Sequence, residues 1–305
     1  MFRKLIAVAL FAVTGSAVTG FAATPPCPRV HEVATADTLS SLASFYFGSQ
    51  DFAPAILVAT NSRVGKEFTF ISSPFSLAGV AAVCIPDALE AERSRSRYAT
   101  YRKAVSGMAV TQPWEVADDA LVTIAAGQPV TVASWTRAGK FKIGQNTLTG
   151  DLWVTVAPHL QDFCKKFFAD HNKSDDELTL RLEQRIGLPP AAGYTTMAVV
   201  SITPSSTNIF RPCSDPSTSA ANCQSGGPMS GASAAYKSWF NNQYFGSYGA
   251  PSPNLYPWTS LGYTFDWAQQ ADGEFVRIGE SEFVIPAGTQ IDVTALATTA
   301  QYCSN

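Results

Sequence analysis

The fold of the amino-terminal part is decided by residues 31–61, which read HEVATADTLSSLASFYFGSQDFAPAILVATN. Residues 31–33 have the character of a short extended strand. Asp37-Thr38 then supplies a helix N-cap, and residues 39–46 place apolar side chains at helical spacing. We therefore expect a strand that is followed closely by a helix.

The rest of this segment predicts a second helix and a closing strand. Gly48 breaks the first helical pattern, and Pro54 stands where a second helix would start. Asn61 can end that helix. After a polar stretch, residues 77–79 predict a turn and residues 83–86 predict a strand. The expected order of elements is strand, helix, helix, strand.

Several of these residues, taken in order, resemble the landmarks of the LysM domain family. The matching positions are His31 and Val33, Asp37-Thr38-Leu39, Leu42-Ala43, Gly48, Ala55-Ile56-Leu57, Ala59-Thr60-Asn61, and Gly79 with Ile85-Pro86. The resemblance covers residues 31–86 and predicts a module over residues 27–86. There are three departures: Ala36 stands where the family usually has glycine, residues 62–76 form a longer stretch than in the shortest members, and residues 79–86 are slightly extended.

The resemblance implies that the module binds polymers containing N-acetylglucosamine, such as peptidoglycan or chitin, without a cofactor. By position, the glycan contacts would come from two loops. The first loop supplies Thr35, Ala36, Asp37 and Thr38, and the second supplies Leu77, Ala78 and Gly79. The competing interpretation gives these residues purely structural roles, in which Asp37 caps a helix and Leu77 fills the core.

The first residues have the three-part layout of a secretory signal peptide. Arg3 and Lys4 precede an apolar run over residues 5–13, and small residues follow as far as Ala22. A membrane span is the competing interpretation, but the apolar run is shorter than the ~20 residues that a bilayer requires. We expect residues 1–22 to be removed, which leaves a mature chain without a transmembrane span. The expected location is the periplasm, the cell wall or the extracellular space.

Charge and cysteine content limit the partners further. Removal of residues 1–22 takes away two of the 21 basic residues and none of the 24 acidic ones, so the formal charge becomes −5, which disfavours nucleic acid. All six cysteines lie beyond the expected cleavage point and predict disulfides. No C-x-x-C pair occurs, so we expect no metal site. Many pairings are possible, and we prefer Cys27 with Cys84, which bracket the module, Cys164 with Cys303, and Cys213 with Cys223.

The chain after the module changes character twice. Asp87, with Glu90 three residues later, predicts the start of a connecting helix over residues 87–108. Residues 110–305 then show short β-prone runs separated by turns. Strands are expected at 121–124, 129–135, 140–143, 152–156, 197–202, 275–278, 282–285 and 291–296, and helices at 160–168 and 175–186. The predicted fold class is α+β, with a βααβ module, a connecting helix and a strand-dominated mixed α/β domain.

Aromatic residues are dense in the second domain. Eleven of them lie between Tyr236 and Trp267. They could form a stacking platform for sugar rings, but their spacing fits an ordinary core better. Trp258, which follows a proline in a turn, is the best candidate for an exposed aromatic.

Three carboxylates in the second domain are candidate catalytic residues. Glu280 and Glu282 are two apart on an expected strand, which places both on one face about 7 Å apart, a separation found between glycosidase carboxylates. Asp266, beside Trp267, is the third candidate. The competing interpretation is that both glutamates line the solvent face of the strand. No G-x-S-x-G, H-E-x-x-H or S-x-x-K pattern occurs.

We therefore expect an exported cell-envelope protein that binds a peptidoglycan- or chitin-like glycan through its LysM-like module, and we favour a binding role over an enzymatic one. Two alternatives remain open. One is a wall-targeted glycoside hydrolase with its active site in residues 110–305. The other is a surface or assembly protein that the module anchors.

Overall fold

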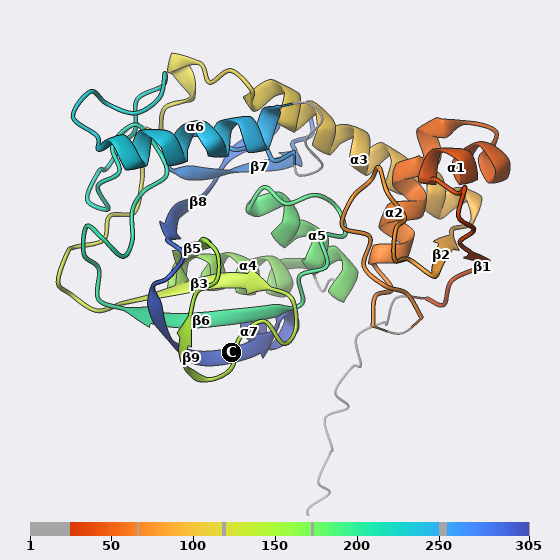
Figure 1. The fold of residues 1–305 in the computed structure, drawn as a ribbon, viewed down its shortest axis with the longest axis horizontal. Helices are drawn as coiled ribbons and strands as arrows, with labels where there is room; N and C mark the ends of the chain where they lie inside the picture. Colours follow the sequence, from red (N-terminus) through yellow and green to blue (C-terminus); the bar gives the residue numbers. More distant parts are fainter. Residues whose placement is uncertain (1–24, 66, 118–119, 172–173, 250–254, 305) are drawn as a thin grey trace, which may run out of the picture.

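A computed structural model describes the chain as a mixed α+β protein with one small and one large antiparallel sheet (Figure 1). The residues described are 25–65, 67–117, 120–171, 174–249 and 255–304. The expected signal peptide, residues 1–22, lies outside them.

The amino-terminal module is built on the two-stranded sheet. Its elements are β1 (Arg29–Glu32), α1 (Leu39–Phe47), the short helix η1 (Gln50–Phe52), α2 (Ala53–Asn61) and β2 (Ala82–Ile85). The two strands pair antiparallel, with Glu32 opposite Ala82. The buried core of the module consists of Leu39, Leu42, Ala43, Ile56, Leu57, Val58, Ile71, Leu77, Val80, Val83 and Ile85.

Local signals fix the ends of α1. Thr38 is the N-cap, and its hydroxyl accepts a hydrogen bond from the Ser41 N–H at 3.0 Å while the Ser41 hydroxyl accepts one from the Thr38 N–H. Gly48 ends the helix in the left-handed conformation, with φ of 75°. That conformation favours glycine because a side chain there is strained. The helix is therefore confined to the residues between these two caps.

Helix α3 (Ala88–Met108) connects the module to the rest of the chain. The Asp87 side chain caps its first turn by accepting from the Glu90 N–H at 2.8 Å. Near this start, Arg63, two residues after the end of α2, forms an ion pair with Glu90 at 2.8 Å. Later in the helix, the Tyr101 hydroxyl donates to the carbonyl oxygen of Leu255 at 2.8 Å. The helix is thus packed on the module at one end and on the second domain at the other.

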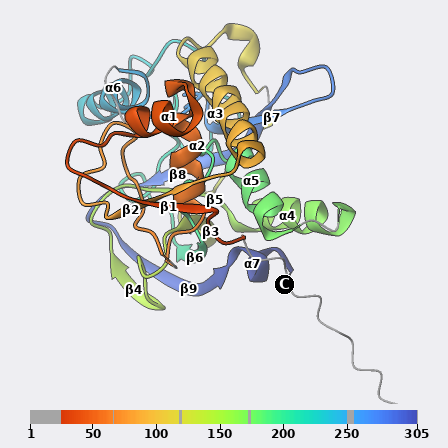
Figure 2. The same ribbon diagram turned by 90° about the vertical axis from the view of Figure 1, so that its right-hand side faces the viewer.

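The large sheet has seven antiparallel strands in the order β4-β9-β6-β3-β5-β8-β7. The strands are β3 (Val130–Thr136), β4 (Gly144–Thr147), β5 (Leu152–Val156), β6 (Thr196–Ile202), β7 (Tyr263–Gln269), β8 (Phe275–Ile285) and β9 (Gln290–Thr298). The helices are η2 (Pro113–Glu115), α4 (Ala157–His171), α5 (Asp175–Arg185), α6 (Ala234–Tyr248) and α7 (Thr299–Ser304). Figure 2 shows the β7 edge on the side of α3 and the β4–β9 edge on the opposite side.

The large sheet buries both of its faces. One face packs against α4, α5 and α7 through a cluster that includes Trp135, Leu160 and Leu182. The other face buries alternate residues of the same strands, such as Val132 and Val200. Burial on two faces explains why the strands read as nearly continuous apolar runs rather than as alternating ones.

Two of the expected strands are absent from the described structure. Leu121, Val122 and Ile124 are apolar and at least partly buried, but they lie in a loop. The Leu121 N–H donates to the Ala221 carbonyl and the Ile124 N–H to the Thr218 carbonyl, so this segment pairs with another loop and not with a strand. Residues 140–143 lie in the irregular segment that precedes β4. Conversely, the two strands expected at 275–278 and 282–285 form the single strand β8.

Three disulfides crosslink the described chain. They join Cys27 to Cys84, Cys164 to Cys303, and Cys213 to Cys223, which are the pairs preferred from the sequence. The first ties the chain just before β1 to β2, and the second ties α4 to α7. Among the helices of the described residues, none has both the length and the apolar character of a membrane span.

Candidate functional site

The two loops expected to bind glycan emerge from the same end of the β1–β2 sheet. The Val33 N–H donates to the Ala81 carbonyl oxygen at 2.9 Å, one position beyond the Glu32–Ala82 pair that closes the sheet. Residues 34–38 follow Val33, and residues 76–80 precede Ala81. The antiparallel register therefore places the first loop beside the second.

In the first loop, Asp37 holds the backbone and does not cap the helix. Its Oδ2 accepts from the Ala34 N–H at 2.7 Å and from His31 Nε2 at 2.9 Å. The other ring nitrogen of His31 lies 2.9 Å from the Tyr46 hydroxyl. The hydrogen bond from His31, followed by that from Ala34, lowers the pKa of the Asp37 carboxyl. The structural role expected for Asp37 was therefore wrong in its detail, because Thr38 is the N-cap.

This His31–Asp37–Tyr46 arrangement was missed in the sequence. Thr35, Ala36 and Thr38 remain exposed around it. The signal that could have found it is the position of His31 on a strand that leads into the loop, with an acidic residue six positions later. Such a pair closes a short loop on itself.

The second loop divides into a buried and an exposed part. The Leu77 side chain is buried in the module core, so its expected contribution to glycan contact is limited to the backbone. Ala78 and Gly79 are exposed. Gly79 has φ of 77°, and no atom lies within 4 Å of the position that a Cβ would take there. A side chain added at Gly79 would project into open space.

The two loops offer unpaired hydrogen-bond donors to solvent. Within the described part of the chain, the backbone N–H groups of Thr35, Ala36 and Gly79 donate to no protein acceptor. All three residues are exposed. Backbone donors of this kind are available to a ligand that carries carbonyl oxygens.

A cavity of about 330 Å³ lies between the module and the second domain. Leu39, Ser40 and Leu57 line it from the module, and Pro189 and Tyr256 line it from the second domain. None of the seven residues expected to bind glycan lines this cavity. The loop pair is therefore an exposed surface and is not part of this cavity.

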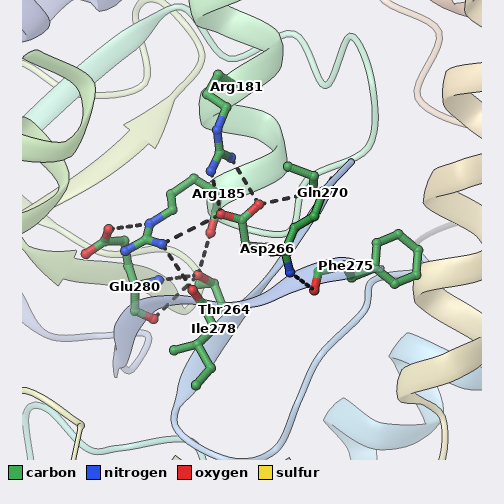
Figure 3. Close-up of polar contacts among 9 residues, drawn as sticks. Arg181, Arg185, Thr264, Asp266, Gln270, Phe275, Ile278 and Glu280 are labelled. Carbon is green, nitrogen blue, oxygen red and sulfur yellow. Dashed lines mark hydrogen bonds and ion pairs between the residues drawn. The ribbon is translucent and has the colours of Figure 1, made fainter. Parts of the chain in front are cut away.

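Two of the three candidate catalytic carboxylates form ion pairs with α5 (Figure 3). Arg181 donates to both oxygens of Asp266, at 3.0 and 2.7 Å. Arg185 donates to Glu280 Oε1 at 2.7 Å and lies 3.6 Å from Asp266 Oδ2. Both guanidinium groups also lie over the Phe163 ring. These carboxylates are held by positive charge on a helix, so their arrangement is that of a structural network.

The burial of Glu280 and Glu282 corrects the expectation that they line the solvent face. Each retains an exposed fraction of only 5%. Arg185 of α5 covers Glu280, whereas Glu282 is buried beside Arg211 and Trp258. The sequence offered no sign of this cover, because Arg185 and Glu280 are 95 positions apart.

Glu282 differs from the other two carboxylates. Burial raises its pKa to about 8, and the positive charge of Arg211 opposes that rise. Its carboxyl group is therefore protonated and uncharged at neutral pH. Asp266 and Glu280 share Arg185, but Glu282 has no ion pair with α5 among the described residues. The structure does not join the three carboxylates into one site.

The aromatic residues between Tyr236 and Trp267 form core for the most part. Tyr236, Phe240 and Trp258 are buried in one cluster, and Trp267 packs on Tyr101 of α3 at a centroid distance of 5.6 Å. The expectation of an exposed Trp258 was wrong, because Phe240 lies 4.8 Å from its ring and leaves it 5% exposed. The described residues contain no group of three His, Cys, Asp or Glu side chains placed to hold a metal ion.

Comparisons with known proteins identify no relative. No protein-family model matches the chain, and neither curated proteins nor solved structures give a match.

Proposed function

We propose that the chain is an exported envelope protein and that its LysM-like module binds a glycan containing N-acetylglucosamine on the paired loops. The observation that carries this proposal is the hydrogen bond between Val33 and Ala81, which brings residues 34–38 beside residues 76–80. The ligand would be a peptidoglycan- or chitin-like polymer.

The chemistry of the loops suits an acetamido sugar. An N-acetyl group presents a carbonyl oxygen, an amide N–H and a methyl group. The free N–H groups of Thr35, Ala36 and Gly79 supply donors for the carbonyl oxygen, and the exposed Ala36 and Ala78 supply small apolar contacts for the methyl group. No cofactor takes part in such recognition, which depends on backbone donors and shape.

Three disulfides support export, because such crosslinks persist in oxidising compartments. We assign the protein to the periplasm, the cell wall or the extracellular space on that basis. The ion pairs of Asp266 and Glu280 favour a binding role over a hydrolytic one, because arginine side chains of α5 already occupy both carboxylates.

A single loop surface of this size gives weak binding. Association costs several kcal/mol of lost translational and rotational freedom before any contact shows as affinity. A repeating polymer compensates by offering many equivalent positions for rebinding. We therefore expect the protein to be retained on an insoluble polymer while it binds a short soluble fragment weakly at this surface.

The test is sedimentation of the mature chain with purified peptidoglycan sacculi and with chitin. The proposal predicts that the protein is found in the pellet and that no sugar or muropeptide is released into the supernatant. Release of soluble fragments would support the glycoside hydrolase instead. Protein that remains in the supernatant with both polymers would contradict the proposal.

A further inference from the structure

A second candidate site lies in the domain that follows α3. A cavity of about 490 Å³ is enclosed by β3, β5 and β8 of the large sheet and by residues 256–258, and it also extends to residues 186–188 at the end of α5. Its volume falls within the range of about 300–1,000 Å³ that small-molecule sites occupy. None of the residues of the module lines it.

Three buried polar atoms on the wall of this cavity have no hydrogen-bond partner within the described residues. They are Thr155 Oγ1, Trp258 Nε1 and Glu282 Oε1. Thr155 and Glu282 are opposed on β5 and β8, so their side chains lie on the same face of the sheet. The Trp258 indole lowers the pKa of Glu282 through its N–H, yet the two groups do not reach hydrogen-bond geometry.

The cost of these unpaired atoms points to a ligand. Each buried polar group without a partner destabilises a fold by about 1–3 kcal/mol. Three such groups on one cavity wall, with donors and an acceptor among them, form a ready site for a molecule with several hydroxyl groups.

The aromatic lining suits the apolar faces of a sugar ring. Trp135, Trp153, Tyr256 and Trp258 all line the cavity. The rings of Trp153 and Trp258 lie 6.3 Å apart at an interplanar angle of 83°, which makes a corner with two differently oriented surfaces. A pyranose ring can lay its C–H face on one of these rings while its hydroxyl groups meet the polar atoms.

The charges around the cavity favour a neutral ligand. Burial keeps Glu282 protonated at neutral pH, so its carboxyl group both donates and accepts hydrogen bonds. At the exposed rim, Lys140 and Asp151 carry opposite charges. Asp151 already accepts from Trp239 Nε1 at 2.7 Å and from the Ala287 N–H at 3.0 Å. Among the residues that line the cavity, charge is therefore confined to the exposed rim, whereas the three polar atoms that lack partners are buried and belong to uncharged groups.

We propose that this cavity binds a neutral sugar of one or two pyranose rings, with hydroxyl groups that pair with Thr155, Trp258 and Glu282. The inference stands on residues outside the module and is independent of the glycan surface on the paired loops. It gives the second domain a binding role of its own.

The test is a titration of the mature chain with glucose, N-acetylglucosamine and N,N′-diacetylchitobiose, followed by tryptophan fluorescence. All six tryptophans lie outside residues 27–86, so a saturable change reports on the second domain. We expect such a change with at least one of the three sugars. The absence of a saturable change with all three, up to their solubility, would overturn the inference.

Variants locate the site within the domain. Thr155→Val removes the unpaired hydroxyl and should weaken binding about tenfold, because a buried hydrogen-bonding group of the ligand then lacks its partner. The matched control is Thr131→Val, an exposed threonine on β3, which should bind like the wild type. Equal binding by the two variants would overturn the assignment to this cavity.

The pH dependence of sugar binding is a second test, and it remains usable if the Thr155→Val variant does not fold. Glu282→Gln keeps a neutral group that donates and accepts, so its affinity should stay close to that of the wild type at pH 7. Above about pH 8 the wild type should lose affinity as Glu282 deprotonates, whereas Glu282→Gln should not. Parallel pH profiles would overturn the inference. If the sugars do not bind while the protein still sediments with the polymer, the inference about this cavity fails and the proposed function of the module stands.

Discussion

The backbone N–H of Val33 donates to the carbonyl oxygen of Ala81 at 2.9 Å, and this bond joins the two loops on which the proposed glycan surface depends. It extends the β1–β2 ladder by one position past Glu32 and Ala82. Because the loops begin on either side of this bond, any change that loosens the ladder should separate them. The stability of the small sheet is therefore coupled to binding.

The interaction of His31 with Asp37 should control the shape of the first loop. Asp37→Ala removes the acceptor for the Ala34 N–H and for the His31 ring, and we expect polymer binding to weaken about three- to tenfold. Asp37→Asn retains one oxygen acceptor and should lose less. Sedimentation isotherms on sacculi measure both effects. Equal binding by wild type and Asp37→Ala would show that the loop does not need this support.

The hydrogen bonds that hold the first loop to Asp37 should break only at strongly acidic pH. The hydrogen bond from His31 lowers the pKa of Asp37 below its ordinary value of 3.8, so the native contacts favour the charged carboxylate. The contribution of these contacts to stability is present above pH 3.8, and it is lost as the pH falls through the lower pKa that Asp37 has in the native state. The protection factor of the Ala34 amide against hydrogen exchange should stay high at pH 5 and fall at lower pH. An exchange profile identical to that of Asp37→Ala would contradict this expectation.

Glu183 should make the protein less stable as the pH rises. Its side chain is 3% exposed and accepts from the Ala192 N–H at 2.8 Å, and burial raises its pKa to about 8 from an ordinary 4.5. Between these values the native state binds a proton that the unfolded state releases. The free energy of unfolding should fall by up to about 1.4 kcal/mol per pH unit for this group.

Thermal unfolding between pH 5 and pH 9 measures this effect. Glu183→Gln should show a shallower decrease of Tm with pH than the wild type, and Glu282 should account for part of the slope that remains. An unchanged slope in Glu183→Gln would mean that Glu183 is ionised in the native state.

The network around Asp266 should stabilise the fold. Asp266→Asn leaves Arg181 and Arg185 without their shared carboxylate, and we expect a loss of about 3–5 kcal/mol in the free energy of unfolding. Denaturant unfolding measures the loss. The control is Asp272→Asn, an exposed acid in the β7–β8 turn, which should cost no more than about 0.5 kcal/mol. Equal stability of the two variants would remove the structural role assigned to Asp266.

The disulfides should differ in their effect on stability and on glycan binding. The Cys27–Cys84 bond spans 57 positions, and its removal by a double alanine substitution should cost about 4 kcal/mol. The Cys213–Cys223 bond spans 10 positions and should cost about 3 kcal/mol. Thermal unfolding and sedimentation test both variants. Only removal of the Cys27–Cys84 bond should weaken polymer binding, because that bond ties the chain beside β1. Weaker polymer binding in the Cys213–Cys223 variant alone would contradict this expectation.

The local features of this fold could be predicted from the sequence. The start and end of α1 follow from Thr38 and Gly48, and the start of α3 follows from Asp87, because each depends on hydrogen bonds within a few residues. Such helix-end signals are contained in short windows of sequence. The Cys27–Cys84 bond spans 57 positions and could be predicted for a different reason, because the two cysteines bracket one compact module.

Long-range contacts could not be predicted in the same way. The burial of Asp266 depends on Arg181, which is 85 positions away, and nothing near Asp266 in the sequence indicates that partner. Residues 121–124 have strand character, but the large sheet is complete without them. Thr155 and Glu282 line one cavity only because β5 and β8 pair in the folded chain. Sequence patterns therefore identified residues of the second domain without identifying their surroundings.

The most direct measurement of the central claim compares Gly79→Trp with Gly48→Trp in sedimentation on sacculi. Both glycines have a positive φ, 77° and 75°, and both have open space where a side chain would start, so the two substitutions impose similar backbone strain. Gly48 ends α1 about 14 Å along the helix axis from the first loop, whereas Gly79 lies in the second loop. We expect Gly79→Trp to stay in the supernatant and Gly48→Trp to sediment like the wild type. Equal sedimentation of both folded variants would place glycan binding elsewhere on the molecule.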